Sequence, residues 1–158
     1  MDSISFTLDA NKEIWEFLDK TAGHVLVHNF HAHNYIEWWT STIKINPQIT
    51  LDNVKVRDMQ FDIQTNVSGL KQILDIESNF LDIYQFTKPI ADTLTIDALP
   101  KENAINILKQ NGLQHIICVE FELITVKSFS SDFINSIRDN PLFADRIRVN
   151  NLADKNEN

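Results

Sequence analysis

The chain has 158 residues, a formal net charge of −8 at pH 7 and a hydrophobic content of 43%, with ten Phe and three Trp. This size and composition predict a globular protein with a core of its own, and they exclude a disordered chain. The acidic balance argues against a protein that binds the nucleic-acid backbone directly, because such proteins concentrate Lys and Arg.

Three further features of the sequence exclude particular kinds of protein. A single cysteine, Cys118, excludes an internal disulfide and fits a reducing compartment. The three glycines, at positions 23, 69 and 112, stand too far apart for a glycine-rich nucleotide loop. No apolar run approaches the roughly eighteen residues of a membrane span, and the amino-terminal residues lack the pattern of a signal peptide. We therefore expect a cytoplasmic protein without membrane contact.

The first predicted element is a helix over residues 10–21, capped by Asp9 and amphipathic in its pattern. Residues 24–45 are rich in β-branched and aromatic side chains, which favours two strands with a bend near His33. The same stretch also fits one long helix, and the sequence leaves both alternatives open.

A strand is expected over residues 51–65, and its apolar positions change phase midway. This change predicts a β-bulge near Arg57. A bulge inserts one extra residue into a strand, so the apolar residues before and after it can lie on the same buried face. A longer helix is predicted next, over residues 70–86, with Asn66 or Ser68 as its cap.

The second half of the chain alternates short elements. Residues 93–98 read as a short strand, and a helix over residues 101–111 is expected to end at Gly112. Residues 113–127 then read as a central strand, since apolar and polar side chains alternate along it.

A last helix is expected to start at Ser130 or Ser131 and run to about Asp139. Helices and strands without regular alternation favour the α+β class, with a mostly antiparallel twisted sheet and about four helices packed on it. We expect a single domain over residues 1–149 and a disordered tail over residues 150–158.

Four of the five histidines lie within ten residues of one another, which makes this segment a candidate metal site. If it is a strand, His31 and His33 project to one face together with Glu37, and such a group can bind zinc or another transition metal. The sequence lacks the HExxH and paired-cysteine motifs that would strengthen this interpretation. The alternative is that the histidines only make hydrogen bonds at the sheet surface. The cluster consists of His24, His28, His31 and His33.

Two further groups have both a functional and a structural interpretation. Glu120 and Glu122 share a face of the predicted central strand, where they can form an acid–base pair or simply the wet side of a sheet. Cys118 on the same face reads as an inert buried thiol rather than a nucleophile.

Carboxylates gather on one side of the predicted helix over residues 70–86. Such a face can steer a basic protein at a high rate, and nearby aromatic side chains can supply desolvated contact area. The residues expected to contact a partner are Asp75, Glu77, Asp82, Trp38, Trp39 and Tyr84.

The leading hypothesis is a small acidic protein-binding module without a cofactor. Its most concrete form is an immunity or antitoxin-type inhibitor that neutralises a basic partner such as a nuclease toxin. One alternative is a small metal-binding enzyme or sensor that uses the His24–His33 cluster. Another is a structural subunit of a homo-oligomer.

Overall fold

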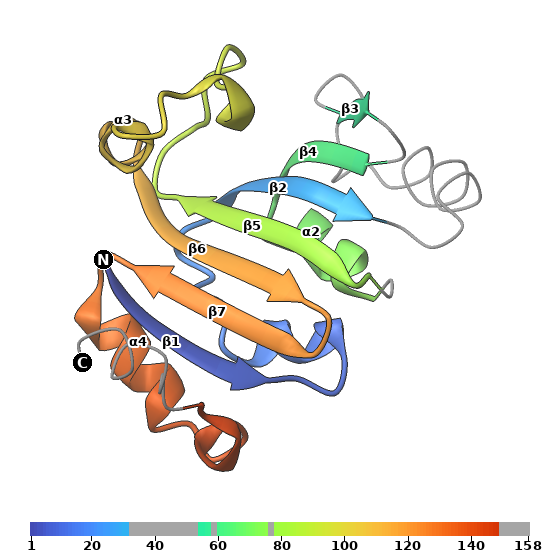
Figure 1. The fold of residues 1–158 in the computed structure, drawn as a ribbon, viewed down its shortest axis with the longest axis vertical. Coiled ribbons are helices and arrows are strands. Elements are labelled where there is room, and N and C mark those ends of the chain that lie inside the picture. The colour runs from blue at the N-terminus through green and yellow to red at the C-terminus, as the bar shows by residue number, and fades with distance from the viewer. Residues whose placement is uncertain (32–53, 58–59, 76–77, 149–158) are drawn as a thin grey trace, which may run out of the picture.

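The computed structural model describes residues 1–31, 54–57, 60–75 and 78–148. Within these residues the chain has an α+β fold built on a seven-stranded sheet, in which every neighbouring pair of strands is antiparallel. The strand order is β1-β7-β6-β5-β2-β4-β3, so β5 and β6 lie near the middle of the sheet (Figure 1). The prediction of an α+β class with a mostly antiparallel sheet is therefore confirmed.

The strands are short, as is usual in globular proteins. They are β1 (Asp2–Thr7), β2 (His24–His31), β3 (Val54–Arg57), β4 (Gln60–Asn66), β5 (Phe80–Phe86), β6 (Leu113–Glu120) and β7 (Leu123–Ser128).

The described helices are short as well, and none is long and apolar enough to cross a lipid bilayer. The α-helices are α2 (Val67–Leu74), α3 (Ala104–Gln110) and α4 (Ser131–Arg138), and the 3₁₀ helices are η1 (Asn11–Glu16), η4 (Ile96–Ala98) and η5 (Ala144–Arg146).

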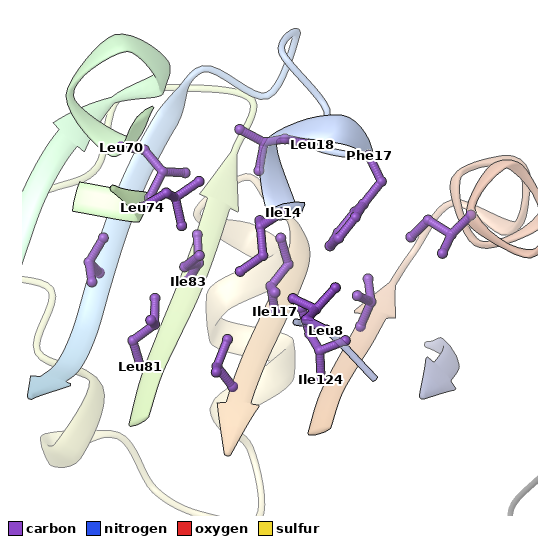
Figure 2. Close-up of a cluster of buried hydrophobic side chains, with 14 of the residues drawn as sticks. Leu8, Ile14, Phe17, Leu18, Leu70, Leu74, Leu81, Ile83, Ile117 and Ile124 are labelled. Carbon is purple, nitrogen blue, oxygen red and sulfur yellow. The ribbon is translucent and has the colours of Figure 1, made fainter. Parts of the chain in front are cut away.

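The larger hydrophobic core lies on one face of the sheet, beneath η1, α2 and α4. Alternate residues of each strand point into it, as the period of two requires. Figure 2 shows Ile83, Ile117 and Ile124 of three neighbouring strands directed toward Ile14 of η1 and Leu70 of α2. This face therefore holds helices and sheet together by apolar burial.

The opposite face carries a smaller apolar cluster. Leu26, Phe86 and Ile116 of the sheet pack there with Leu108 of α3 and with the segment that joins β5 to α3. Leu94 is the most deeply buried residue that this segment contributes. A long connection between two elements thus covers part of the second face.

The outer edge of β1 is partly covered by the end of the described chain. Ile147 forms a β-bridge with Phe6, and the Arg148 N–H donates to the Ser5 carbonyl over 2.8 Å. Covering an edge strand in this way satisfies backbone groups that would otherwise pair with another chain.

The predicted central strand over residues 113–127 is in fact a hairpin of β6 and β7. The alternation holds as far as Glu120, which lies opposite Leu123 across a two-residue turn. Phe121 occupies the first turn position with a φ of 55°. Glycine or asparagine usually marks such a position, and their absence explains why the turn was missed.

The predicted helix over residues 70–86 is wrong in its second half. Helix α2 ends at Leu74, and Asn66, not Ser68, caps it by accepting the Gly69 N–H over 2.9 Å. The residues from Phe80 onward form β5, which pairs with both β2 and β6. Pairing on two sides outweighed a helical spacing that local sequence alone favoured.

Three smaller predictions are also wrong. The helix over residues 10–21 is only the 3₁₀ helix η1, and no side chain caps it. The bulge near Arg57 is replaced by a reversal of the chain, because β3 and β4 pair with each other and Arg57 lies opposite Gln60. Residues 93–98 contain η4 rather than a strand, and β1 was not predicted.

Other predictions are confirmed. Gly112 follows α3 with a φ of 93°, the left-handed conformation expected after a helix end. Ser130 caps α4, with its Oγ accepting the Phe133 N–H over 3.2 Å. The amino-terminal part of the 24–45 segment is the strand β2, whereas the expected bend near His33 lies outside the described residues.

Candidate functional site

An open hollow lies at the end of the sheet where the β6–β7 turn meets the start of β5 and the segment after β1. Its volume is about 450 Å³. The Leu8 N–H donates to the Glu122 carbonyl over 2.9 Å, and the Phe121 N–H donates to the Asn79 carbonyl over 2.7 Å. These backbone bonds join three of the chain segments that line the hollow.

Apolar side chains are exposed at this hollow. Phe121 is 60% exposed, and its ring makes an edge-to-face contact with Phe80 at 4.8 Å between centroids. Leu123 is 38% exposed beside them. A bulky residue with a positive φ is a genuine outlier, so this turn presents an aromatic ring at a cost in backbone energy.

Charged side chains surround the same hollow. Asp9, Glu120 and Glu122 line it and are exposed, and Arg148 is the basic residue among the lining side chains. The local balance is therefore acidic, in line with the net charge of the chain.

A second candidate lies on the sheet face that carries the smaller apolar cluster. The buried imidazole of His28 bonds two carboxylates, with Nδ1 at 2.8 Å from Asp62 Oδ1 and Nε2 at 3.1 Å from Asp97 Oδ1. Asp62 belongs to β4 and Asp97 to η4, so one side chain joins two elements to β2.

Both His28 contacts require a donor on the ring, because an ionised carboxylate only accepts hydrogen bonds. Burial lowers the pKa of His28, but the hydrogen bond and charge of Asp62 and the charges of Asp97 and Asp82 outweigh it and leave the pKa raised. The imidazolium form therefore matches the observed geometry.

Three titratable groups near His28 have raised pKa values. Burial, helped by the charge of Asp82, raises the pKa of the Cys118 thiol to about 12. Burial also raises the pKa of Tyr84 and of Asp82, although the Cys118 hydrogen bond and the charge of His28 oppose the rise at Asp82. Cys118 is thus a poor nucleophile, as the sequence predicted.

The space beside His28 is small. A cavity of about 20 Å³, lined in part by Leu26, Gln64 and Leu94, has room for about one water molecule. Among the described residues, the His28 cluster therefore joins β2, β4 and η4 and leaves no room for a larger ligand.

A third polar cluster lies on the other face of the sheet. His115 Nε2 is 2.7 Å from Asp19 Oδ2, and Nδ1 is 2.7 Å from Ser128 Oγ. Ser128 Oγ also accepts the Ser130 N–H over 2.8 Å, so its own hydrogen is directed to Nδ1. Burial lowers the pKa of His115 despite Asp19. This assigns the neutral ring, with its proton on Nε2.

Aspartate, histidine and serine in a row invite comparison with a hydrolytic triad. Ser128 is only 1% exposed and His115 is fully buried, so no substrate reaches the hydroxyl. The hydroxyl hydrogen and one acceptor position are also already used. The arrangement is a structural connection between β6, β7 and the residue Asp19.

The predicted partner-binding residues do not form one helical face. Asp75 is exposed at the carboxyl end of α2, whereas Asp82 and Tyr84 lie half-buried on β5 near His28. Glu77, Trp38 and Trp39 lie outside the described residues. A role for any of them in binding a partner stays a prediction.

The predicted metal ligands are only partly described. His31 ends β2, while His33 and Glu37 lie outside the described residues. Elsewhere in the described part of the chain, no group of three or more His, Cys, Asp or Glu side chains can hold a metal ion. His28 of the same cluster has both ring nitrogens bonded to aspartates.

Sequence reasoning missed the exposed Phe121 and the two carboxylate–histidine clusters. A continuous strand over residues 113–127 leaves no turn at Phe121, and no glycine or asparagine marks one there. His28 and His115 each meet partners far along the chain, and no local spacing signals such contacts. Comparison of the chain with protein-family models, curated proteins and solved structures finds no significant match.

Proposed function

We propose that the protein is an acidic protein-binding module that holds a basic protein at the hollow beside the β6–β7 turn. Its most concrete form is an inhibitor that neutralises a basic enzyme such as a nuclease toxin. The observation that carries the proposal is Phe121, an exposed aromatic ring on a strained turn between two exposed glutamates.

The hollow combines exposed apolar side chains with carboxylates, and this combination suits the Lys and Arg side chains of a basic partner. Phe121 and Leu123 line the hollow and offer apolar area to the aliphatic part of a Lys or Arg side chain, and Phe80 packs against Phe121. Glu120 and Glu122 flank that area and attract the charged end. Aromatic side chains in such settings are frequent binding hot spots.

The test measures which proteins of a basic fraction the immobilised protein retains at low and at physiological salt. We expect one basic protein to be retained, to be lost from a Glu120→Lys/Glu122→Lys variant, and to be lost from Phe121→Gly. Retention should weaken as salt rises, because exposed charges are screened.

The matched control is Asp92→Lys/Glu102→Lys, which changes the net charge equally in the connection between β5 and α3, at residues that do not line the hollow. It should keep the partner. If both double variants lost the partner equally, net charge alone would explain its retention, and the hollow would not be the binding site. A mass that doubles with concentration in the wild type but not in Phe121→Gly would show instead that a second copy occupies it.

A further inference from the structure

We propose that the hollow beside the β6–β7 turn takes the carboxy-terminal arginine of the basic partner. The terminal carboxylate of that arginine binds Arg148, and its guanidinium binds Glu120 and Glu122. This inference rests on the proposed function and deepens it, because it names the part of the partner that enters the hollow. The observation that carries it is the presence of opposite charges on two sides of one hollow.

The positive side of the hollow is Arg148. Its backbone N–H donates to the Ser5 carbonyl over 2.8 Å, and Ile147 before it forms the β-bridge with Phe6. These contacts hold Arg148 at the outer edge of β1, on the side away from β7. Arg148 is exposed and lines the hollow, and its guanidinium has no hydrogen bond or ion pair within the described part of the chain. It is therefore available to an anionic group.

The negative side lies across β1, at the β6–β7 turn. Leu123 of β7 pairs with Thr7 of β1, and the Glu122 carbonyl accepts the Leu8 N–H over 2.9 Å. Neighbouring strands lie about 4.8 Å apart, so the turn and the segment that covers the other edge of β1 are separated by roughly 10 Å. The carboxylates of Glu120 and Glu122 are exposed and make no ion pair with any described residue.

The third carboxylate of the hollow is directed elsewhere. Asp9 Oδ2 lies 3.4 Å from an Nη atom of Arg146, which also bonds Glu13. The charges that remain for a ligand are thus one guanidinium on one side and two carboxylates on the other.

An arginine at the end of a chain carries both charges that this arrangement requires. Its guanidinium presents N–H donors in a planar fork, which can bond two carboxylates and stack on an aromatic face such as that of Phe121. Its α-carboxylate lies at the other end of the same residue. An arginine within a chain has no such carboxylate, and Arg148 would repel its guanidinium. The charge of Arg148 therefore favours a terminal residue.

The experiment compares acetyl-Gly-Gly-Arg that has a free carboxylate with the same tripeptide in its amidated form, titrated at low salt and followed by NMR of the backbone amides. We expect the Phe121, Glu122 and Leu123 signals to shift, and the α4 signals to stay in place. The free-acid peptide should bind about threefold or more tightly, as expected for one exposed ion pair. Equal affinities would overturn the role of the terminal carboxylate.

A lysine peptide tests the choice of guanidinium. Acetyl-Gly-Gly-Lys with a free carboxylate keeps both charges, but its ammonium is a compact, strongly hydrated point charge without the planar fork. It should bind more weakly than the arginine peptide, and equal binding would overturn the assignment of arginine.

Arg148→Ala is the decisive variant. It removes the cation and keeps the backbone N–H that bonds Ser5. The free-acid peptide should lose its advantage, whereas the amidated peptide should bind at least as well as to the wild type, a change that damage to the fold would not produce. Arg138→Ala is the control, because Arg138 is exposed on α4 and does not line the hollow. The inference is refuted if both variants keep the wild-type preference.

Failure of this inference can be told apart from failure of the proposed function. If neither peptide shifts the signals of the hollow while a basic protein is still retained and is lost from Glu120→Lys/Glu122→Lys, the terminal arginine is refuted and the proposed function stands. If no basic protein is retained either, both are refuted.

Discussion

The Nε2 atom of His115 lies 2.7 Å from Oδ2 of Asp19, and this hydrogen bond joins residues 96 positions apart in the chain. His115 is fully buried on β6, while Asp19 lies between η1 and β2. Together with Ser128 of β7, this pair connects the segment between η1 and β2 to the strands β6 and β7.

Removal of the Asp19 side chain should therefore destabilise the protein. Asp19→Ala leaves the buried Nε2–H of His115 without its acceptor, and we expect a loss of about 1–3 kcal/mol in the free energy of unfolding. Asp145→Ala, at an exposed site in η5, should change it by less than about 0.5 kcal/mol. Urea unfolding at neutral pH measures both. Equal free energies of unfolding for Asp19→Ala and Asp145→Ala would contradict a stabilising role of the Asp19–His115 pair.

The two buried histidines should respond to pH in opposite directions. The pKa of His115 is lowered, so its contribution to stability is present above pH 6.5 and lost as pH falls through the folded value. The pKa of His28 is raised, so its contribution is lost as pH rises. NMR titration of the ring protons should place one midpoint on each side of 6.5. Two midpoints on the same side would contradict the assignment.

Backbone strain at Phe121 should be visible in a pair of substitutions. Both Phe121→Gly and Phe121→Ala remove the ring and its contact with Phe80, but only glycine adopts the φ of 55° freely. We expect Phe121→Gly to be about 1 kcal/mol more stable than Phe121→Ala, since the left-handed conformation costs about 1–2 kcal/mol for other residues. Thermal unfolding compares them, and the reverse order would contradict strain at this turn.

Gly112 should be intolerant of a side chain. A Cβ atom there would lie 2.6 Å from Cγ of Lys88, and the φ of 93° is itself unfavourable for alanine. We expect Gly112→Ala to lower the free energy of unfolding by more than about 1 kcal/mol. Gly23→Ala is the control, because an added Cβ meets nothing within 4 Å. Comparable losses in chemical denaturation would show that neither the conformation nor the contact matters.

The cap of α2 should distinguish two neighbouring residues. Asn66→Ala removes the acceptor of the Gly69 N–H and should cost about 1 kcal/mol. Ser68→Ala, an exposed position in the first turn, should cost less than about 0.5 kcal/mol. The midpoint of urea denaturation measures the difference, and a larger loss from Ser68→Ala would reverse the assignment of the cap.

Local sequence was enough for some of these features. Ser130 and Gly112 mark helix ends because capping and left-handed conformations are properties of single residues and their near neighbours. The alternation along residues 113–120 predicted the strand β6 for the same reason, since a period of two is a local pattern.

Other features had no local signal. The apolar spacing of residues 80–84 fits a helix as well as a strand, and only pairing with β2 and β6 makes the segment β5. The β6–β7 turn places Phe121 where glycine is usual, so the sequence reads as one continuous strand. Tertiary hydrogen bonding decided both cases.

The sequence by itself therefore determined the α+β class, two helix boundaries and the strand β6, because these depend on neighbours within a few residues. Only the tertiary structure decided the site chemistry. The bonds of His28 and His115 reach across 34, 69 and 96 residues, and the exposure of Phe121 depends on where the chain reverses. The protonation of a buried imidazole depends on such partners, since they alone determine which form of the ring is stabilised.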